Sequence, residues 1–143
     1  MREILFRGKQ EYKNKEWVFG NLHCEYGETD KNGQRKIDYR ILGMRGECDY
    51  VLSETVGQFT GMTDKNGKKI FEGDIVRVLG NQQVDDWKNV DYVALIAFLD
   101  GGFCAIDGTV EEHGFRRYAL ARMDFSLEII GNQFDNPELL ENP

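Results

Sequence analysis

The stretch "TVGQFTGMTDKNGKKIFEGDIVRV", from Thr55 to Val78, decides the fold class of this chain. It holds the turn "DKNG" at Asp64–Gly67 and a second turn at Gly73-Asp74, with apolar residues on either side of each. Asn-Gly is a strong hairpin signal because both residues adopt left-handed backbone angles easily. Short apolar runs between such turns are typical of β-strands. The stretch therefore predicts strands joined by tight turns.

A metal or phosphate site in this stretch is excluded by spacing. An EF-hand loop needs glycine at its sixth position and glutamate at its twelfth, but counting from Asp64 these residues are Lys69 and Ile75. A Walker loop needs Gly-Lys-Ser/Thr leading into a helix, whereas Gly67 is followed by two lysines and Ile70. Three lysines lie around the turn, Lys65, Lys68 and Lys69. We interpret them as a solvated hairpin tip rather than a basic binding spot.

Along the rest of the chain, glycine turns recur at the short intervals typical of a mainly β protein. The predicted fold class is therefore mainly β, or a β-dominated α+β fold. Sixteen glycines separate short runs rich in Val, Ile, Phe and Tyr. Further strands are predicted within 3–8, 16–26, 36–43, 92–106 and 126–132, the fourth range being a hairpin that turns at Asp100-Gly101-Gly102. In 36–43, Ile37, Tyr39 and Ile41 alternate with polar residues, as in a half-buried strand. We expect loops at 81–90 and 108–123, a short helix near 53–56, and a helical turn in the tail with Asn136 as its cap.

The Gly73-Asp74 turn leads into the alternating apolar residues Ile75, Val76 and Val78. A turn of this kind entering a strand is common in small SH3-like barrels. We therefore predict an SH3-like barrel in the C-terminal half. Such barrels serve many functions, so the pattern indicates architecture only.

Composition places the chain among ordinary soluble proteins. Of 143 residues, 41% are hydrophobic and 30% charged, which is enough for a core and unlike a disordered chain. The charged N-terminus lacks the unbroken apolar core of a signal peptide, and no run approaches the length of a membrane helix. We expect a cytoplasmic protein without membrane partners. The net charge of −7 does not favour nucleic acid as the default partner.

Cysteine and histidine usage gives no metal or cofactor signal. Cys24, Cys48 and Cys104 are widely spaced and contain no CxxC pair, so we interpret them as small buried hydrophobes. A zinc site needs about four clustered ligands, and the only histidines are His23 and His113. We predict no metal site and no cofactor.

Three functions are compatible with these features, and we prefer the first. It is a non-catalytic module that binds a macromolecule, with Trp17, Trp87 or Phe115 as candidate anchors, although a core position is the commoner place for such rings. The second is nucleic-acid binding by a loop of arginines and aromatic residues: Phe115, Arg116, Arg117, Tyr118 and Arg122. The competing interpretation is an ordinary charged loop, in which Glu111 and Glu112 balance the arginines. The third is catalysis, for which Glu54, Asp74, His113 and Asp124 are the acid–base candidates. No spacing brings any two of these together, and we expect no enzyme. Exposed strand edges would also allow homo-oligomers.

Three segments together carry a family resemblance. "ETVGQFTGMTDKNGKKIFEGDIV", the start "REILFRG" and the ending "EIIGNQFDNPELL" closely resemble the YopX family of phage and prophage proteins, with the "FLDGGF" hairpin between them. Ser53 stands where members often carry a proline. The resemblance implies one YopX-like domain over 1–143, divided into a hairpin region at 1–55, a barrel-like part at 56–135 and a tail at 136–143. It implies small, mainly β, phage-encoded proteins without an established activity, and it transfers no site residues. The expected location is then the cytoplasm of the bacterial host, and the expected partner is a host or phage macromolecule.

Overall fold

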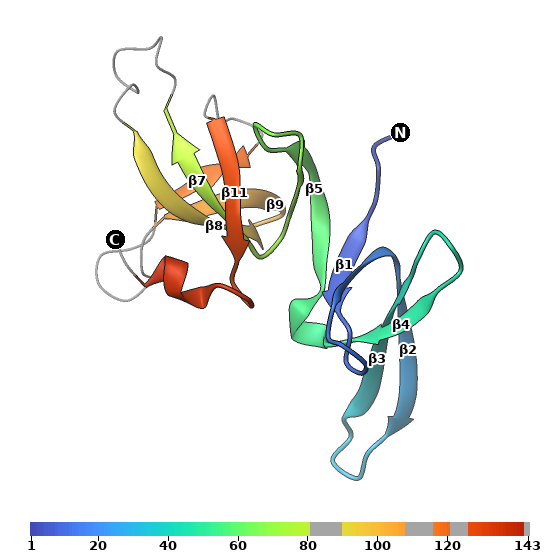
Figure 1. Ribbon diagram of the computed structural model, residues 1–143. Helices are drawn as coiled ribbons and strands as arrows, with labels where there is room; N and C mark the ends of the chain where they lie inside the picture. The colour runs from blue at the N-terminus through green and yellow to red at the C-terminus, as the bar shows by residue number, and fades with distance from the viewer. Residues whose placement is uncertain (81–89, 108–115, 121–125, 142–143) are drawn as a thin grey trace. The chain divides into compact units, whose positions relative to one another are not determined.

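The computed structural model describes residues 1–80, 90–107, 116–120 and 126–141 (Figure 1). These residues form antiparallel strands and short 3₁₀ turns, without an α-helix in the part described, so the predicted mainly β class is confirmed. The first half contains β1 Phe6–Lys9, β2 Trp17–Thr29, β3 Arg35–Leu42, β4 Cys48–Val51, η1 Ser53–Thr55 and β5 Gly57–Thr63. The second half contains β6 Lys69–Phe71, β7 Asp74–Leu79, β8 Asp91–Leu99, β9 Gly102–Asp107, β10 Arg116–Ala119, β11 Ser126–Asn132 and η3 Pro137–Leu140.

Two compact units divide the chain, Met1–Phe59 and Thr60–Pro143. One sheet has the strand order β4-β3-β2-β1-β5-β6 and the other β10-β9-β8-β7-β11. Strand β5 crosses the division: its first residues pair with β1, and its later residues belong to the second unit with β6. Each unit is described separately below.

In the N-terminal unit, β1 to β4 wrap around one shared face. Strands β1 and β2, predicted within 3–8 and 16–26, pair with each other as an antiparallel hairpin, with Arg7 opposite Phe19. Beyond β1, Gln10 bridges to Val51, and the Leu52 N–H donates to the Lys9 carbonyl at 2.9 Å. The residues after β1 therefore meet β4 while β1 itself pairs with β2. Ile41 and Val51 are buried inside this wrap, at 1% and 3% exposure.

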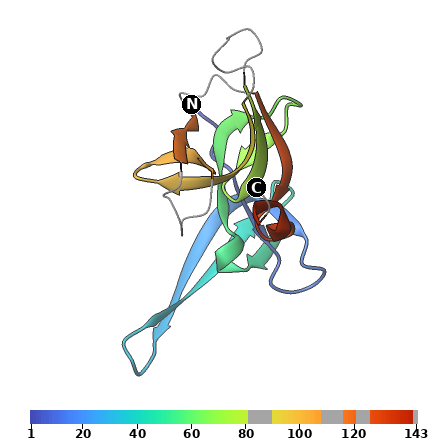
Figure 2. The ribbon, with the colours of Figure 1, turned by 90° about the vertical axis from the view of Figure 1, so that its left-hand side faces the viewer.

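Strands β2 and β3 continue past β1 and β4 as a two-stranded ribbon (Figures 1 and 2). This explains one difference from the sequence prediction. Ile37, Tyr39 and Ile41 do share one face of β3, but only Ile41 is buried, and Ile37 is 38% exposed. Alternation identifies a common face, but whether other strands cover that face depends on how far they extend.

The C-terminal unit holds the larger hydrophobic cluster. Strands β7 to β10 follow one another as neighbours, and β11 returns to pair with β7. Their inner residues form one buried cluster with β6: Ile70, Val76, Val78, Ala94, Ile96, Ala105, Leu120 and Leu127. Leu127 of the last strand belongs to this cluster, and Ile129 packs against it. Within the described residues, β10 and β11 are the two edge strands of this sheet and do not pair with each other. Closure of the sheet into an SH3-like barrel therefore stays a prediction.

Local predictions fared unevenly. Asp100 and Gly101 have positive φ angles of 50° and 81° and join β8 to β9, as the "DGG" turn indicated. The tail forms η3 behind Pro137, but the Asn136 side chain caps nothing there and instead accepts from the Asn132 N–H at 3.3 Å. The predicted helix near 53–56 is present as η1. The loop prediction for 108–123 is wrong at 116–119, which form β10. Residues 81–89, most of the other predicted loop, lie outside the described residues.

Candidate functional site

The outward-facing side of the N-terminal unit brings cations and aromatic rings together. Arg7 and Lys9 of β1 stand opposite Phe19 and Trp17 of β2, and residues directly opposite in an antiparallel pair lie on the same face. Alternation along β2 carries that face from Phe19 to His23, which pairs with Arg40 of β3. Arg40 in turn stands opposite Tyr50 of β4. We call this surface the cation–aromatic face and define it by Arg7, Lys9, Trp17, Phe19, Arg40 and Tyr50.

Trp17 is held by the two cations of β1. The Arg7 guanidinium carbon lies 4.6 Å from the centre of the indole ring, and the Lys9 ammonium lies 5.8 Å from it. Both distances are within the range of a cation–π attraction. Arg7 is only 7% exposed, so its charge supports the ring from below the surface. The sequence left open whether Trp17 lies in the core or on the surface. In the structure it is half-buried, which is between these two alternatives.

A second cation–aromatic pair lies on β3 and β4. The Arg40 guanidinium carbon is 4.5 Å from the centre of the Tyr50 ring, which is 38% exposed. Arg40 also donates to the carboxylate of Glu25. Burial works against the charged form, but hydrogen bonds to Glu25 and Cys48 raise the Arg40 pKa above its ordinary value. The guanidinium therefore stays charged while it stacks on the ring.

A surface pocket adjoins this face where β2 begins. It has a volume of about 340 Å³ and lies between Trp17, Phe19 and the turn from β3 to β4. The turn contributes Met44, Arg45 and Glu47 to its wall. Phe19 and Met44 are exposed, at 47% and 94%. The pocket thus offers apolar surface with charged groups at its margin.

Asp49 also lines the pocket, but its carboxylate is engaged in the fold. Its Oδ1 accepts from the Gln10 side-chain amide at 3.1 Å and from the Lys13 ammonium at 3.0 Å. These contacts tie the segment after β1 to β4. Asp49 is buried, with 8% of its surface exposed. We therefore assign it a positioning role in the wall of the pocket.

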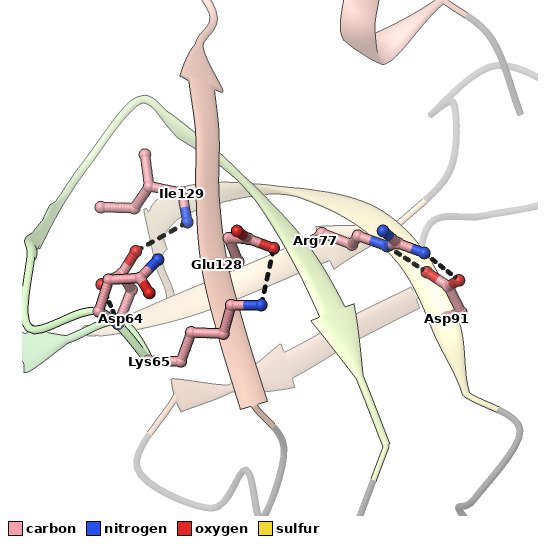
Figure 3. A network of polar contacts seen from close by, with 7 residues as sticks. Asp64, Lys65, Arg77, Asp91, Glu128 and Ile129 are labelled. Atoms are coloured by element: carbon pink, nitrogen blue, oxygen red, sulfur yellow. Dashed lines mark hydrogen bonds and ion pairs between the residues drawn. The ribbon is translucent and has the colours of Figure 1, made fainter.

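The "DKNG" turn at Asp64–Gly67 is tied to β11 by its own side chains (Figure 3). Asp64 Oδ1 accepts the N–H groups of Asn66 and Lys68, both at 2.9 Å, and Oδ2 accepts the N–H of Ile129 in β11 at 3.1 Å. Burial acts to raise the Asp64 pKa, but these backbone hydrogen bonds hold it below its ordinary value. The Lys65 ammonium adds an ion pair with Glu128 at 3.0 Å. The lysines at this turn are exposed, as the hairpin-tip interpretation predicted.

The turn geometry corrects one detail of the prediction. Gly67 and Gly33 have φ angles of 79° and 80°, whereas Asn66 and Asn32 are not among the residues with positive φ. In each copy the glycine N–H bonds to the aspartate carbonyl at 3.0 Å, three residues back. The hairpins are therefore built on a type I-like turn followed by a left-handed glycine.

The predicted nucleic-acid residues are only partly within the described chain. Arg116, Arg117 and Tyr118 lie on β10, where their backbones pair with Asp107, Ile106 and Ala105. They therefore sit on a strand and not on the predicted loop. Phe115 and Arg122 lie outside the described residues, as do Trp87, Glu111 and Glu112.

Two of the four catalytic candidates lie within the described residues, one in each unit. Glu54 lies in η1 of the first unit, while Asp74 begins β7 in the second and accepts from the Phe71 N–H at 2.8 Å. His113 and Asp124 lie outside the described residues. In the part of the chain that the structure covers, no three His, Cys, Asp or Glu side chains cluster as metal ligands.

The cysteine prediction holds at one of three positions. Cys104 is buried in the C-terminal unit, Cys24 is half-buried and Cys48 is exposed. Cys48 lies on β4 opposite Leu42, which is itself 41% exposed. Its exposure follows from its position on the outer side of the wrapped strands.

Sequence reasoning missed the cation–aromatic face, apart from naming Trp17 as a candidate anchor. Its residues come from four strands, and no short motif contains two of the stacked pairs. The available signal was the alternation of Arg7 and Lys9 in β1 and of Trp17 and Phe19 in β2. That pattern identifies a side of each strand, but the register between strands is needed to join the sides.

Comparison with known proteins gives the following matches. The model of the family described as YopX protein matches residues 5–141. A crystal structure of protein yopX from Bacillus subtilis is 21% identical, covers 98% of this chain and 99% of its own, and superposes with a TM-score of 0.54. A crystal structure of protein EF1440 from Enterococcus faecalis is 24% identical with the same coverages and a TM-score of 0.47. Among curated proteins none matches the chain. Within the described residues, no helix is long and apolar enough to span a membrane.

Proposed function

The chain belongs to the YopX family, and we propose that it acts as a non-catalytic module that binds a macromolecule. We further propose that it is a phage- or prophage-derived accessory protein working in the cytoplasm of a bacterial host. The family has no established activity, so the proposal rests on the surface of this chain.

One observation carries it. Among the described residues, large apolar side chains that are exposed gather in the N-terminal unit: nine are in 1–59, and only Phe98 and Ile130 are in the rest. Three of the nine, Phe19, Leu42 and Met44, come from the start of β2, the end of β3 and the turn after it. Contiguous exposed apolar surface of this kind marks interaction sites.

The same regions support binding over catalysis. The acid–base candidate in the N-terminal unit, Glu54, is 3.4 Å from the Ser53 hydroxyl and lies on η1, apart from the residues that line the pocket. Asp74 is engaged with the backbone of its own turn. Around the pocket the chemistry is apolar and aromatic with a charged margin, which suits recognition.

For the C-terminal unit we propose an SH3-like arrangement. Its strand order, β11-β7-β8-β9-β10, is that of four strands in succession with a fifth returning to the first. SH3-like barrels have this order. The alternative function, nucleic-acid binding by Arg116, Arg117 and Tyr118 with Phe115 and Arg122, would place the contact at the β10 edge of this sheet.

A tagged pull-down from lysate of the bacterial host tests the binding proposal. The bait is the wild-type chain, the double variant Phe19→Ser/Met44→Ser, and the control Ile130→Ser, which changes an exposed apolar residue of the other unit. Each is run with and without nuclease. We expect a specific companion that the double variant loses and the control keeps. Recovery of the same material by all three baits, or of the bait alone, would contradict the proposal.

A further inference from the structure

The net charge of the chain is not evenly distributed between its two units. Residues 1–59 contain ten Lys or Arg and ten Asp or Glu, so the N-terminal unit is neutral. Residues 60–143 contain eight and fifteen, which accounts for the whole charge of −7. The acidity that argued against a polyanionic partner therefore belongs to the second unit.

Within the neutral unit, the cation–aromatic face carries three cations, Arg7, Lys9 and Arg40. Two carboxylates lie on the same side of β2 and β3, where Glu25 stands opposite Asp38. Glu25 is paired with Arg40 and Asp38 with Lys36, so the cations on this side outnumber the carboxylates. Each of the two stacked rings lies within 6 Å of a cation. Phe19 and Tyr50 keep 47% and 38% of their surface exposed.

We propose that the cation–aromatic face, with the pocket beside Trp17 and Phe19, binds single-stranded nucleic acid. This inference rests on the proposed binding function and names its partner class. Exposed rings offer stacking surfaces for unpaired bases, while neighbouring Lys and Arg side chains meet the phosphates. Double-stranded nucleic acid keeps its bases stacked within the helix and would not use these rings.

Spacing on the sheet fits separate bases. Phe19 and His23 are four residues apart on β2, and Tyr50 lies two strands away from His23. At about 3.3 Å per residue and about 4.8 Å per strand, the backbone positions of Phe19 and Tyr50 would be roughly 16 Å apart on a flat sheet. That separation exceeds the ~3.4 Å between stacked bases, so the two rings would engage bases that are not neighbours.

The half-buried Trp17 reports occupancy of the face directly. The chain has two tryptophans, Trp17 and Trp87. In a Trp87→Phe background the indole emission comes from the proposed site alone. The probes are a 12-nucleotide oligo(dT), the same length of oligo(A) RNA, a blunt duplex of equal length, and polyglutamate as an acidic peptide without bases.

On this background we compare three face variants with two matched controls. Phe19→Ala and Tyr50→Ala each remove one exposed ring of the face. Tyr26→Ala removes a 64% exposed ring from the same strand β2, but from the opposite face. Lys31→Gln removes an exposed charge at the tip of the β2–β3 ribbon and is compared with Lys9→Gln. Circular dichroism checks that every variant is folded.

We expect both single strands to quench Trp17, with the duplex and polyglutamate bound at least tenfold more weakly. Each ring variant of the face should weaken binding about fivefold or more, since a stacked base contributes ~1–3 kcal/mol, whereas Tyr26→Ala and Lys31→Gln should change it less than twofold. With Lys9 and Arg40 as phosphate contacts, the slope of log affinity against log salt should be about −1.4.

Three outcomes would overturn the inference. One is the absence of single-strand binding at low salt. Another is equal binding of polyglutamate, which would identify an acidic protein segment as the partner. The last is binding that survives Phe19→Ala/Tyr50→Ala but is lost in Arg116→Gln/Arg117→Gln, which would move the site to β10. Each leaves a specific companion in the pull-down standing, so failure here is distinguishable from failure of the binding function itself.

Discussion

Replacing Asp64 with asparagine tests whether the 64–67 turn is tied to β11 through one carboxylate. Asparagine keeps one acceptor oxygen for the turn but presents an NH₂ group in place of the oxygen that accepts the Ile129 N–H at 3.1 Å. A hydrogen bond to a charged group contributes about 1.5–3 kcal/mol, and a buried donor left unsatisfied costs about 1–3 kcal/mol. Asp64 is only 6% exposed. We therefore expect Asp64→Asn to lower the free energy of unfolding by about 2–4 kcal/mol.

The first copy of the turn supplies the matched control. Asp30 accepts the N–H groups of Asn32 and Gln34 at 2.8 and 2.9 Å, which are the same local contacts. It is exposed, and both contacts lie within its own turn. Because asparagine can make the local bonds too, Asp30→Asn should change the free energy of unfolding by less than about 0.5 kcal/mol.

Urea unfolding of the full chain measures the difference between the two variants. In a Trp17→Phe background the remaining tryptophan lies in residues 60–143, the unit that contains Asp64. With a typical slope of about 1–3 kcal/mol per molar urea, Asp64→Asn should move the midpoint down by roughly 1 M or more, and Asp30→Asn should leave it in place. Equal midpoints for the two variants would refute the assignment of a long-range role to the Asp64 carboxylate.

Three further predictions concern the pKa of Asp64, the close packing at Gly20 and the ion pair between Arg77 and Asp91. The pKa of Asp64 is lowered in the folded state. Its ionised carboxylate therefore stabilises the fold above an unfolded pKa of about 4, and this stabilisation is lost as pH falls through the folded pKa. The difference in unfolding free energy between wild type and Asp64→Asn should narrow below pH 4, and a constant difference would count against this assignment. Gly20→Ala should destabilise the N-terminal unit by at least about 2 kcal/mol because its Cβ would overlap a carbonyl oxygen at the end of β3, whereas Gly102→Ala meets open space and should be nearly neutral in thermal unfolding. Arg77→Gln removes a half-exposed ion pair with Asp91 and should cost less than about 1 kcal/mol; a larger loss on urea unfolding would mean that the pair carries more than a surface contact.

Local chemistry explains what could be read from the sequence. The Asp100-Gly101 turn was predictable because its two residues tolerate positive φ wherever they occur. The late strand at 126–132 was predictable as well, because Leu127 and Ile129 alternate with the polar residues Ser126 and Glu128. The bond from Asp64 to Ile129 spans 65 positions, so no local pattern contains it. Strand β10 was missed since its mixture of charged and aromatic residues is compatible with a loop, and its pairing with β9 makes it a strand.

The candidate site shows the same limit more strongly. Trp17 was named as a possible anchor, but its stacking on Arg7 depends on the β1–β2 register. The pairing of Arg40 with Tyr50 depends on the register between β3 and β4. Net charge could not indicate the face either, because the single value of −7 covers a neutral unit and an acidic one.

The family resemblance and the proposed binding face rest largely on different residues. The stretch from Thr55 to Val78 supplies β5, β6 and β7, and its Asp64 and Asp74 bond to backbone N–H groups. Of the cation–aromatic face, only Arg7 falls within a segment that carries the resemblance, and Arg7 is the member of that face that is almost fully buried. The exposed rings of the face lie outside those segments. A chain can therefore keep the turns and buried contacts that define this fold while its outer face changes, and for that reason membership of the family identifies the architecture without naming the ligand.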